Sequence, residues 1–166
     1  MAGSLGQKNR HILAPLLWLC SGAWLSAQTD FLWLEDGAGS AGGNDYAVDL
    51  SLVNANELGG FQFVLTYDTA ALSIDTVIAL ERVSDVDLFY DQTFPGEVAV
   101  LVAGLSGGVV EPGVGGVVRF ELSVKAGAVQ GASPLTVREI DFSDPVGNTR
   151  PSAAVDGTFI VQGAHV

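Results

Sequence analysis

The chain has 166 residues, the length of one domain, and carries 7 basic against 19 acidic residues, which gives a net charge of −12 at pH 7. This acidity excludes nucleic acid and anionic membrane surfaces as favourable partners and is typical of a soluble protein. The single cysteine excludes a disulfide within the chain.

Residues 1–27 have the three parts of a secretory signal peptide. Two basic residues (positions 8 and 10) precede an apolar run over residues 12–25, and small residues follow. The run is too short for a membrane span, and Pro15 interrupts it. We therefore expect an extracellular bacterial protein that has no contact with the membrane after cleavage. Residues 28–166 then form one domain with a net charge of −14, because two basic residues leave with the signal peptide.

The rest of the sequence consists of short β-type runs separated by turns rich in glycine and proline. No stretch keeps a 3.6-residue apolar period, so we expect little helix. Nine strands are predicted, over residues 30–35, 46–54, 60–67, 71–78, 86–90, 97–104, 116–126, 134–142 and 155–162. The glycine-rich residues 37–43 are expected to form a turn. This pattern predicts an all-β fold of one domain, a two-sheet β-sandwich or jelly roll.

The predicted strand over residues 60–67 has one large apolar face. Phe61, Phe63, Leu65 and Tyr67 share one parity and are predicted to point into the core, while the other parity faces outward. The outward parity consists of Gln62, Val64 and Thr66.

Two further strands alternate in the same way. Val48, Leu50 and Leu52 are predicted core residues, with Asp49 and Ser51 facing outward. In the strand over residues 116–126, the core set is Val118, Phe120, Leu122 and Val124, and the outward set is Arg119, Glu121 and Ser123.

The strand over residues 97–104 is apolar on both parities. Its valines alternate with Ala99, Leu101 and Ala103. A central strand covered on both faces has this pattern, but in a two-sheet sandwich the outer row is instead an exposed apolar patch, which is a candidate docking surface. The sequence leaves both interpretations open.

Carbohydrate binding requires exposed aromatic rings. Trp33 is the only tryptophan after residue 27, and its neighbours predict burial rather than display. Tyr90 and Phe94 flank a turn, where they are candidates for exposure.

Catalytic side chains are scarce. Cys20 leaves with the signal peptide, and its lipoprotein interpretation is disfavoured by the large Leu19 before it. His165, near the end of the chain, is then the only histidine, so we expect neither a catalytic site nor a cofactor. Two carboxylates suffice for glycoside hydrolysis, but the sequence singles out no pair.

Calcium is the one metal ion for which the sequence offers candidate loops, and the acidic loop Ser84–Asp87 has the same interpretation as the one described next. Asp141, Asp144 and Asn148 place oxygen ligands around a short loop, but their spacing is not that of an EF-hand. Turn formation by Asp and Asn side chains explains the same residues and is the preferred interpretation. No metal site is therefore predicted.

The order of these features over residues 46–161 resembles that of a cohesin domain, the receptor module of cellulosome scaffoldins. The matching pieces are VDLSLVN at 48–54, LGGFQFVLTYD at 58–68, GEVAVLVAGL at 96–105, GVVRFELSVK at 116–125 and DGTFIV at 156–161. The resemblance implies a nine-stranded jelly-roll sandwich that binds a small calcium-loaded dockerin module.

The resemblance also implies where the partner binds. In cohesins, dockerin docks on the sheet that contains the third, fifth, sixth and eighth strands. The corresponding positions here are Gln62, Val64, Thr66, Phe94, Ala99, Leu101, Ala103, Gly104 and Leu105. Two alternatives stay open: a carbohydrate-binding module that takes a polysaccharide, and a structural domain of the cell surface or matrix.

Overall fold

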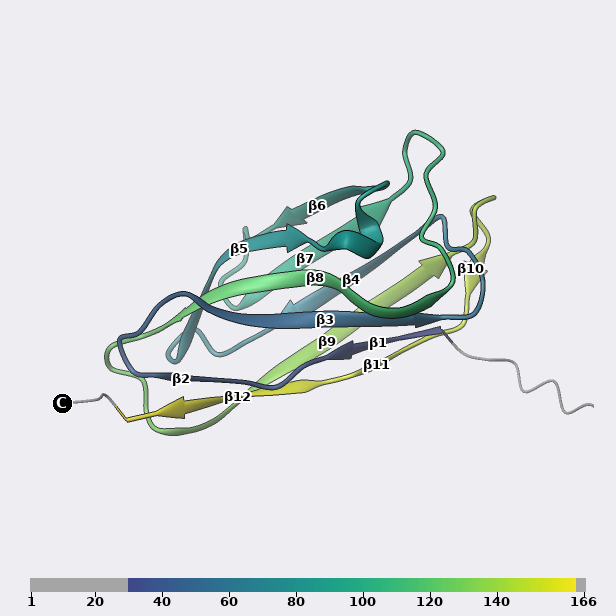
Figure 1. Cartoon of the computed structure of the whole chain (residues 1–166). Coiled ribbons are helices and arrows are strands. Elements are labelled where there is room, and N and C mark those ends of the chain that lie inside the picture. The colour runs from purple at the N-terminus through teal and green to yellow at the C-terminus, as the bar shows by residue number, and fades with distance from the viewer. Residues whose placement is uncertain (1–29, 164–166) are drawn as a thin grey trace, which may run out of the picture.

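The computed structural model describes residues 30–163, which form a sandwich of two β-sheets (Figure 1). These residues contain twelve strands and one short 3-10 helix, η1 at Glu81–Val83. The strands are β1 (Asp30–Leu34), β2 (Gly37–Ser40), β3 (Tyr46–Asn54), β4 (Gly60–Thr66), β5 (Leu72–Ala79), β6 (Asp87–Asp91), β7 (Glu97–Ala103), β8 (Gly113–Val124), β9 (Gly131–Ser143), β10 (Thr149–Arg150), β11 (Ser152–Val155) and β12 (Gly157–Gln162). The predicted signal peptide, Cys20 and His165 lie outside the described residues.

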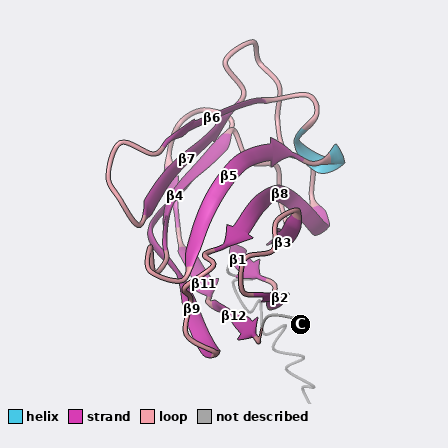
Figure 2. Cartoon of the chain, turned by 90° about the vertical axis from the view of Figure 1, so that its left-hand side faces the viewer, coloured by secondary structure: helices cyan, strands magenta, loops and turns pink. Residues whose placement is uncertain are grey.

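The two sheets contain five and seven strands. The order in the first is β11-β1-β3-β8-β5, and in the second it is β2-β12-β9-β4-β7-β6, with β10 paired to β9. The pairs β1–β11 and β2–β12 are parallel, and the other pairs are antiparallel. In Figure 2, β6 is the outermost strand of its sheet. Residues 30–163 contain no helix with the length and hydrophobicity that a membrane span requires.

The predicted β-sandwich is confirmed, and each of the nine predicted strands has a counterpart. Three short strands, β2, β10 and β11, were not predicted. The expected turn at residues 37–43 is wrong in its first half, because β2 pairs in parallel with β12. A Cβ atom on Gly37 would lie 2.7 Å from both Phe159 and Val48, so glycine is what lets this strand approach the core closely.

The predicted last strand, residues 155–162, is also corrected, because the chain changes sheets at Asp156. Val155 ends β11 in the first sheet, and β12 begins at Gly157 in the second. The Asp156 carboxylate accepts a hydrogen bond from the Val137 backbone N–H (2.8 Å), which holds this corner against β9.

The core fills the space between the sheets and contains the apolar faces predicted for β3, β4 and β8, with Tyr67 half-buried at its margin. Phe61, Phe63 and Leu65 on β4 are at most 2% exposed, and Phe63 packs edge-on against Phe120 of β8, with ring centroids 6.3 Å apart. Apolar area buried in this way is the main source of stability in a domain without disulfides.

Two burial predictions are wrong, and they concern neighbouring residues. Trp33 is 48% exposed, because Leu32 and Leu34 occupy the core face of β1. Ser51, predicted to face solvent, is buried; it lies directly opposite Trp33, so the indole is its neighbour on the outer face of the five-stranded sheet. A register shift between Leu50 and Ser51 also interrupts the alternation there.

Candidate functional site

The outer face of the second sheet carries a row of exposed side chains across three strands, two of them large and apolar. On β4, β7 and β6, the residues Gln62, Leu101 and Phe89 are directly opposite one another. Opposed residues of neighbouring strands point to the same face. Leu101 is 41% and Phe89 47% exposed, so large apolar groups meet solvent at the middle of this face.

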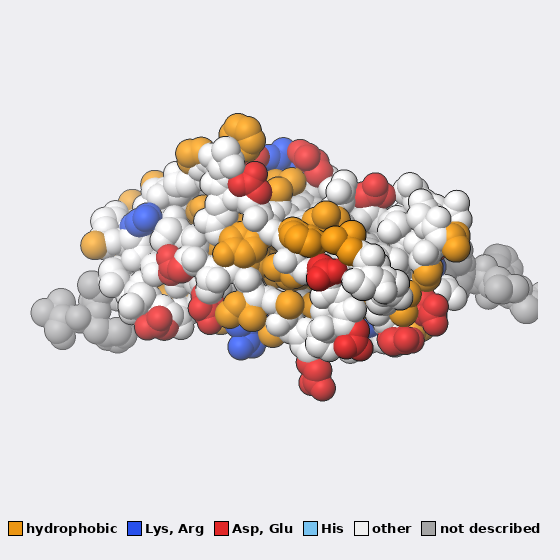
Figure 3. Space-filling model, turned by 90° about the horizontal axis from the view of Figure 1, so that it is seen from above, with side chains coloured by type: hydrophobic (Ala, Val, Ile, Leu, Met, Phe, Trp, Pro, Cys, Tyr) orange, Lys and Arg blue, Asp and Glu red, His pale blue; other side chains and the backbone are white. Residues whose placement is uncertain are grey.

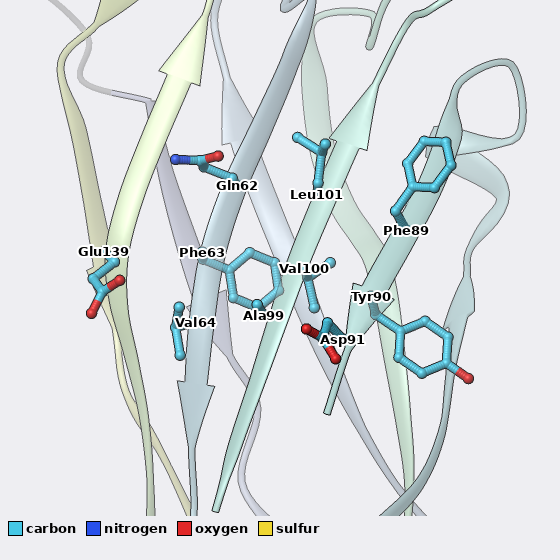
Figure 4. A pocket seen from close by; sticks show the side chains of 10 residues that line it. All are labelled: Gln62, Phe63, Val64, Phe89, Tyr90, Asp91, Ala99, Val100, Leu101 and Glu139. Atoms are coloured by element: carbon cyan, nitrogen blue, oxygen red, sulfur yellow. The ribbon is translucent and has the colours of Figure 1, made fainter. Parts of the chain in front are cut away.

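A second row lies beside the first and completes the floor of a groove. It runs from Val64 through Ala99 to Asp91, again by direct register. The groove has a volume of about 390 Å³ (Figure 4). It is lined by Gln62, Phe63, Val64, Phe89, Tyr90, Asp91, Ala99, Val100, Leu101 and Glu139.

This geometry decides between the two interpretations of β7. The strand lies inside its sheet, between β4 and β6, but its outer face is not covered by any residue of the described range. Ala99 and Leu101 are exposed, whereas Val98, Val100 and Val102 are buried. The exposed apolar patch is confirmed, and the strand covered on both faces is wrong.

The structure brings together only part of the predicted site. Four of its residues, Gln62, Val64, Ala99 and Leu101, line the groove. Phe94, 68% exposed in the turn before β7, lines a smaller hollow of about 220 Å³ that shares Val64 and Ala99 with the groove.

The other predicted site residues lie outside both hollows. Thr66 is half-buried at the end of β4, where its hydroxyl donates to the Thr136 carbonyl (3.4 Å). Ala103 ends β7 toward the opposite end of the sheet, and Gly104 and Leu105 follow it, with Leu105 70% exposed.

Acidic side chains border the apolar floor. Asp91, Glu97 and Glu139 all line the smaller hollow, and Asp141 is exposed on β9, opposite Gln62. The basic group among them, Arg138, donates hydrogen bonds to Glu97 and to Glu139, the latter at 2.9 Å. One guanidinium against four carboxylates leaves this face with a net negative charge.

Asp91 keeps its negative charge to lower pH than an ordinary aspartate. The hydroxyl of Thr93 donates to the carboxylate (2.5 Å), and so does the Thr93 backbone N–H (2.9 Å). These hydrogen bonds lower the pKa of Asp91, because they favour its ionised form.

Three exposed residues of the groove, Phe89, Asp91 and Glu139, were not predicted from the sequence, and Asp91 shares the outward parity of Phe89 on β6. Phe89 has the outward parity of β6, but this was recognisable only once the β6–β7 register was known. Glu139 reaches the groove from a β-bulge, where its φ of 54° is in the left-handed region and the β4–β9 register shifts. Neither signal is present in the local sequence.

The loop that contains Asp144 and Asn148 forms a turn. The Asp144 carboxylate accepts hydrogen bonds from the backbone N–H groups of Val146 (3.0 Å) and Asn148 (2.8 Å) and from the Asn148 side-chain amide (2.8 Å). This is the predicted Asx-type turn. Within residues 30–163, no three His, Cys, Asp or Glu side chains are grouped to bind a metal ion.

Several solved structures that match this architecture are cohesins. A complex of a cohesin with a dockerin from Clostridium thermocellum matches with a TM-score of 0.72 and 16% identity, over 82% of this chain and 95% of the other. A non-cellulosomal cohesin from the archaeon Archaeoglobus fulgidus matches with a TM-score of 0.68 and 22% identity, over 81% and 91% of the two chains. The chain has the cohesin fold.

A third cohesin structure is matched by this chain over the whole of the cohesin's own length. The cohesin CaCohA2 of Clostridium acetobutylicum, solved in complex with a dockerin, has a TM-score of 0.74 and 16% identity, over 81% of this chain and 100% of the other. No protein-family model and no curated protein matches the sequence. The similarity to cohesins therefore lies in the fold. The sequence identities of 16% to 22% are too low to assign roles to individual residues by alignment.

Proposed function

We propose that this chain is a secreted, non-catalytic binding module of cohesin type, which docks a dockerin-like protein on the outer face of β9, β4, β7 and β6. The observation that carries the proposal is the exposed apolar row Leu101–Phe89, set in an acidic border. It lies on a fold whose solved examples include cohesins in complex with dockerins.

The physical properties of this face suit a protein partner. Specific interfaces have an apolar centre that loses its water on binding and a polar rim that fixes orientation. Leu101, Phe89 and Val64 supply the centre, and Asp91 and Glu139 supply the rim. The backbone beneath them is a paired sheet, so little conformational entropy is lost when the partner binds.

A leucine-to-aspartate exchange tests the site. Leu101→Asp places a charge at the centre of the apolar row, where binding would strip it of water, so we expect affinity for a dockerin to fall at least about tenfold. The probes are dockerin modules encoded in the same genome and the dockerins of the matched complexes, measured by isothermal titration calorimetry.

The matched control is Ile78→Asp. Ile78 is 38% exposed, close to the 41% of Leu101, but it lies on β5 in the other sheet. Both variants add the same charge, and each is checked for folding by circular dichroism. Equal affinities of the two variants would contradict the site, and no binding of any dockerin by the wild type would contradict the partner class.

Export is supported by the sequence of residues 1–27 alone. We expect the mature protein to begin near residue 28 and to accumulate outside the cell. Mass spectrometry of the protein from the culture medium checks this, and an intact N-terminus on cell-associated protein would contradict it.

Carbohydrate binding is a second candidate, and exposed Trp33 favours it. The indole lies on the outer face of the five-stranded sheet, one register row from the Asp49–Arg119 ion pair (2.7 Å), so a ring and polar groups are adjacent. Affinity electrophoresis in soluble glucans and xylans tests it. Retardation that is lost in Trp33→Ala or Tyr90→Ala supports sugar binding, and unretarded wild type excludes it for those polymers.

A further inference from the structure

Strand β6 forms an open edge of the seven-stranded sheet and differs from the other sheet edges of residues 30–163. Within the described residues, no strand pairs with the outer side of β6, which ends the order β2-β12-β9-β4-β7-β6. Four of its five residues are exposed, including Phe89 (47%) and Tyr90 (46%). The feature concerns the backbone edge, whereas the face proposed for dockerin is formed by side chains, although Phe89 and Asp91 belong to both.

The other three sheet edges carry features that disfavour pairing with another chain. Strand β2 has only four residues, two of them glycine, and β11 has four and follows Pro151. Strand β5 contains a register shift between Ile74 and Thr76. Short strands, prolines and bulges all protect edges in this way. Strand β6 has none of them, and its register with β7 runs unbroken from Asp87 to Asp91.

The hydrogen bonds of β7 show which backbone groups of β6 are free. Alternate residues of an antiparallel strand direct their N–H and C=O groups to the same neighbour. The Gly104 N–H donates to the Gly59 carbonyl, and the Tyr67 N–H donates to the Gly96 carbonyl, both at 2.9 Å. Even-numbered residues of β7 therefore face β4, and odd-numbered residues face β6.

It follows that alternate residues of β6 direct their backbone N–H and C=O groups away from β7, toward the open side of the sheet. Positions 103, 101 and 99 of β7 are opposite Asp87, Phe89 and Asp91, which are therefore the residues bonded to β7. Leu88 and Tyr90 lie between them, and their N–H and C=O groups are directed to the open side. A further strand can pair there without breaking any existing hydrogen bond.

The charges of the edge indicate what such a strand contains. Asp87 and Asp91 stand four residues apart and point to the same side, with Phe89 between them. Figure 3, seen from the β6 side of the molecule, shows hydrophobic side chains gathered with acidic side chains beside them. A partner strand with two basic residues four positions apart and an apolar residue between them is complementary.

The same charges disfavour a second copy of this chain. Antiparallel pairing of two β6 strands about Phe89 places Asp87 of each copy opposite Asp91 of the other. Two pairs of like charges directly opposite each other destabilise a ladder. The hydrogen bonds from Thr93 also favour the charged form of Asp91.

We propose that the free edge of β6 binds an extended segment of another protein by β-strand addition, and that this segment carries basic residues four positions apart. Backbone hydrogen bonds to Leu88 and Tyr90 supply the affinity, and pairing of the basic residues with Asp87 and Asp91 selects the segment.

The test uses the mature protein, labelled with ¹⁵N, and the peptide acetyl-Gly-Lys-Thr-Val-Thr-Lys-Gly-amide. We expect saturable chemical-shift changes at the Leu88 and Tyr90 amides, together with slower hydrogen exchange of both. Amide protection reports strand pairing, which docking on the outer face does not produce. A wild-type spectrum without shifts at these two amides would overturn the proposal.

Two substitutions at one position isolate the backbone contribution. Tyr90→Pro removes an outward N–H, which an edge strand tolerates, and we expect peptide affinity to fall at least about tenfold. Tyr90→Thr also removes the ring but keeps the N–H, and it should bind within about threefold of wild type. Equal affinity of the proline and threonine variants would overturn the proposal.

A charge exchange keeps the test decisive if the proline variant does not fold. Asp87→Lys should lower the affinity for the lysine peptide by about two- to fivefold, the range of one cross-strand ion pair. It should raise the affinity for the corresponding peptide with glutamate in place of lysine. Unchanged preference would contradict the charge selection. Sedimentation of the wild type covers the remaining occupant, because a dimer that Tyr90→Pro dissolves would assign the edge to a second copy and overturn the proposal.

Discussion

The carboxylate of Asp30 lies 3.0 Å from the guanidinium of Arg150, and this ion pair joins the two sheets. Asp30 begins β1 in the first sheet and is 1% exposed, while Arg150 lies on β10, which pairs with β9 of the second. The other carboxylate oxygen accepts a hydrogen bond from the Ala55 N–H (3.1 Å). The aspartate is thus buried with a hydrogen bond on one oxygen, while the other oxygen has the ion pair to Arg150 but no hydrogen bond within residues 30–163.

Removing the arginine should cost more than neutralising the aspartate. Arg150→Met leaves a buried carboxylate unpaired, so we expect the free energy of unfolding to fall by about 3 kcal/mol, whereas the double variant with Asp30→Asn should recover part of this loss. Urea unfolding of the two single variants and the double variant measures the coupling. Strictly additive changes would show that the pair does not interact in solution.

Arg82 should be a second stabilising cation, because it holds loop backbone in place. Its guanidinium donates to the Leu52 carbonyl (2.8 Å), the Glu111 carbonyl (2.9 Å) and the Asn54 side-chain oxygen (2.7 Å). Partial burial lowers the pKa of Arg82, but the group stays charged at neutral pH. Arg82→Met removes the guanidinium donor from all three acceptors, of which the Glu111 carbonyl keeps a second donor in the Asn54 amide (3.1 Å), and we expect a loss of about 2 kcal/mol in urea unfolding.

Lysine at position 82 should not restore the stability that Arg82 provides. A single ammonium cannot span three acceptors that the planar guanidinium reaches together, so Arg82→Lys should stay closer to the methionine variant than to wild type. Arg119→Met is the control, because Arg119 pairs with Asp49 at the surface and should matter less. A full rescue by lysine would contradict this role.

The turn at Asp144 should give a pH-dependent contribution to stability. Hydrogen bonds from the side chain and backbone of Asn148 lower the pKa of Asp144 below its ordinary value of 3.8. A carboxylate with a lowered pKa in the folded state stabilises the protein fully above its unfolded pKa and loses this effect as the pH falls through the folded value. Wild type should therefore exceed Asp144→Ala in stability above about pH 4, with a difference that shrinks below it.

Urea unfolding of both proteins between pH 7 and pH 2.5 measures this difference. Val146→Ala, in the same turn but without a charge, is the control and should show no such trend. A gap between wild type and Asp144→Ala that stays constant down to pH 2.5 would assign the effect to turn geometry rather than to ionisation.

The acidic border of the groove should control how fast a partner binds. The negative charges on this face attract a basic partner over about 10 Å at 0.1 M salt. Because added salt screens this attraction, the association rate constant should fall as salt is raised. Glu139→Lys should slow association by several-fold and leave the dissociation rate little changed. Glu121→Lys, with the same charge change on β8 of the other sheet, is the control for stopped-flow measurements.

The architecture and most of the core could be predicted from the sequence. Glycine- and proline-rich turns between short apolar runs predicted a β-sandwich, and period-two alternation placed Phe61, Phe63, Leu65 and Phe120 inside it, where each is at most 2% exposed. Both signals are local, because a strand that buries one face must alternate whatever its neighbours are. Alternation also placed Ala99 and Leu101 on a common face.

The residues that lie beside that face and the sheet edges that stay open depend on tertiary packing and could not be predicted from local sequence. Phe89 and Glu139 join the groove through the β6–β7 register and a β-bulge, and Trp33 is exposed because its strand neighbours occupy the core. The change from one sheet to the other at Asp156 also depends on tertiary packing. Register and strand order follow from the sum of packing between segments far apart in the chain, so no single segment carries them in its own sequence.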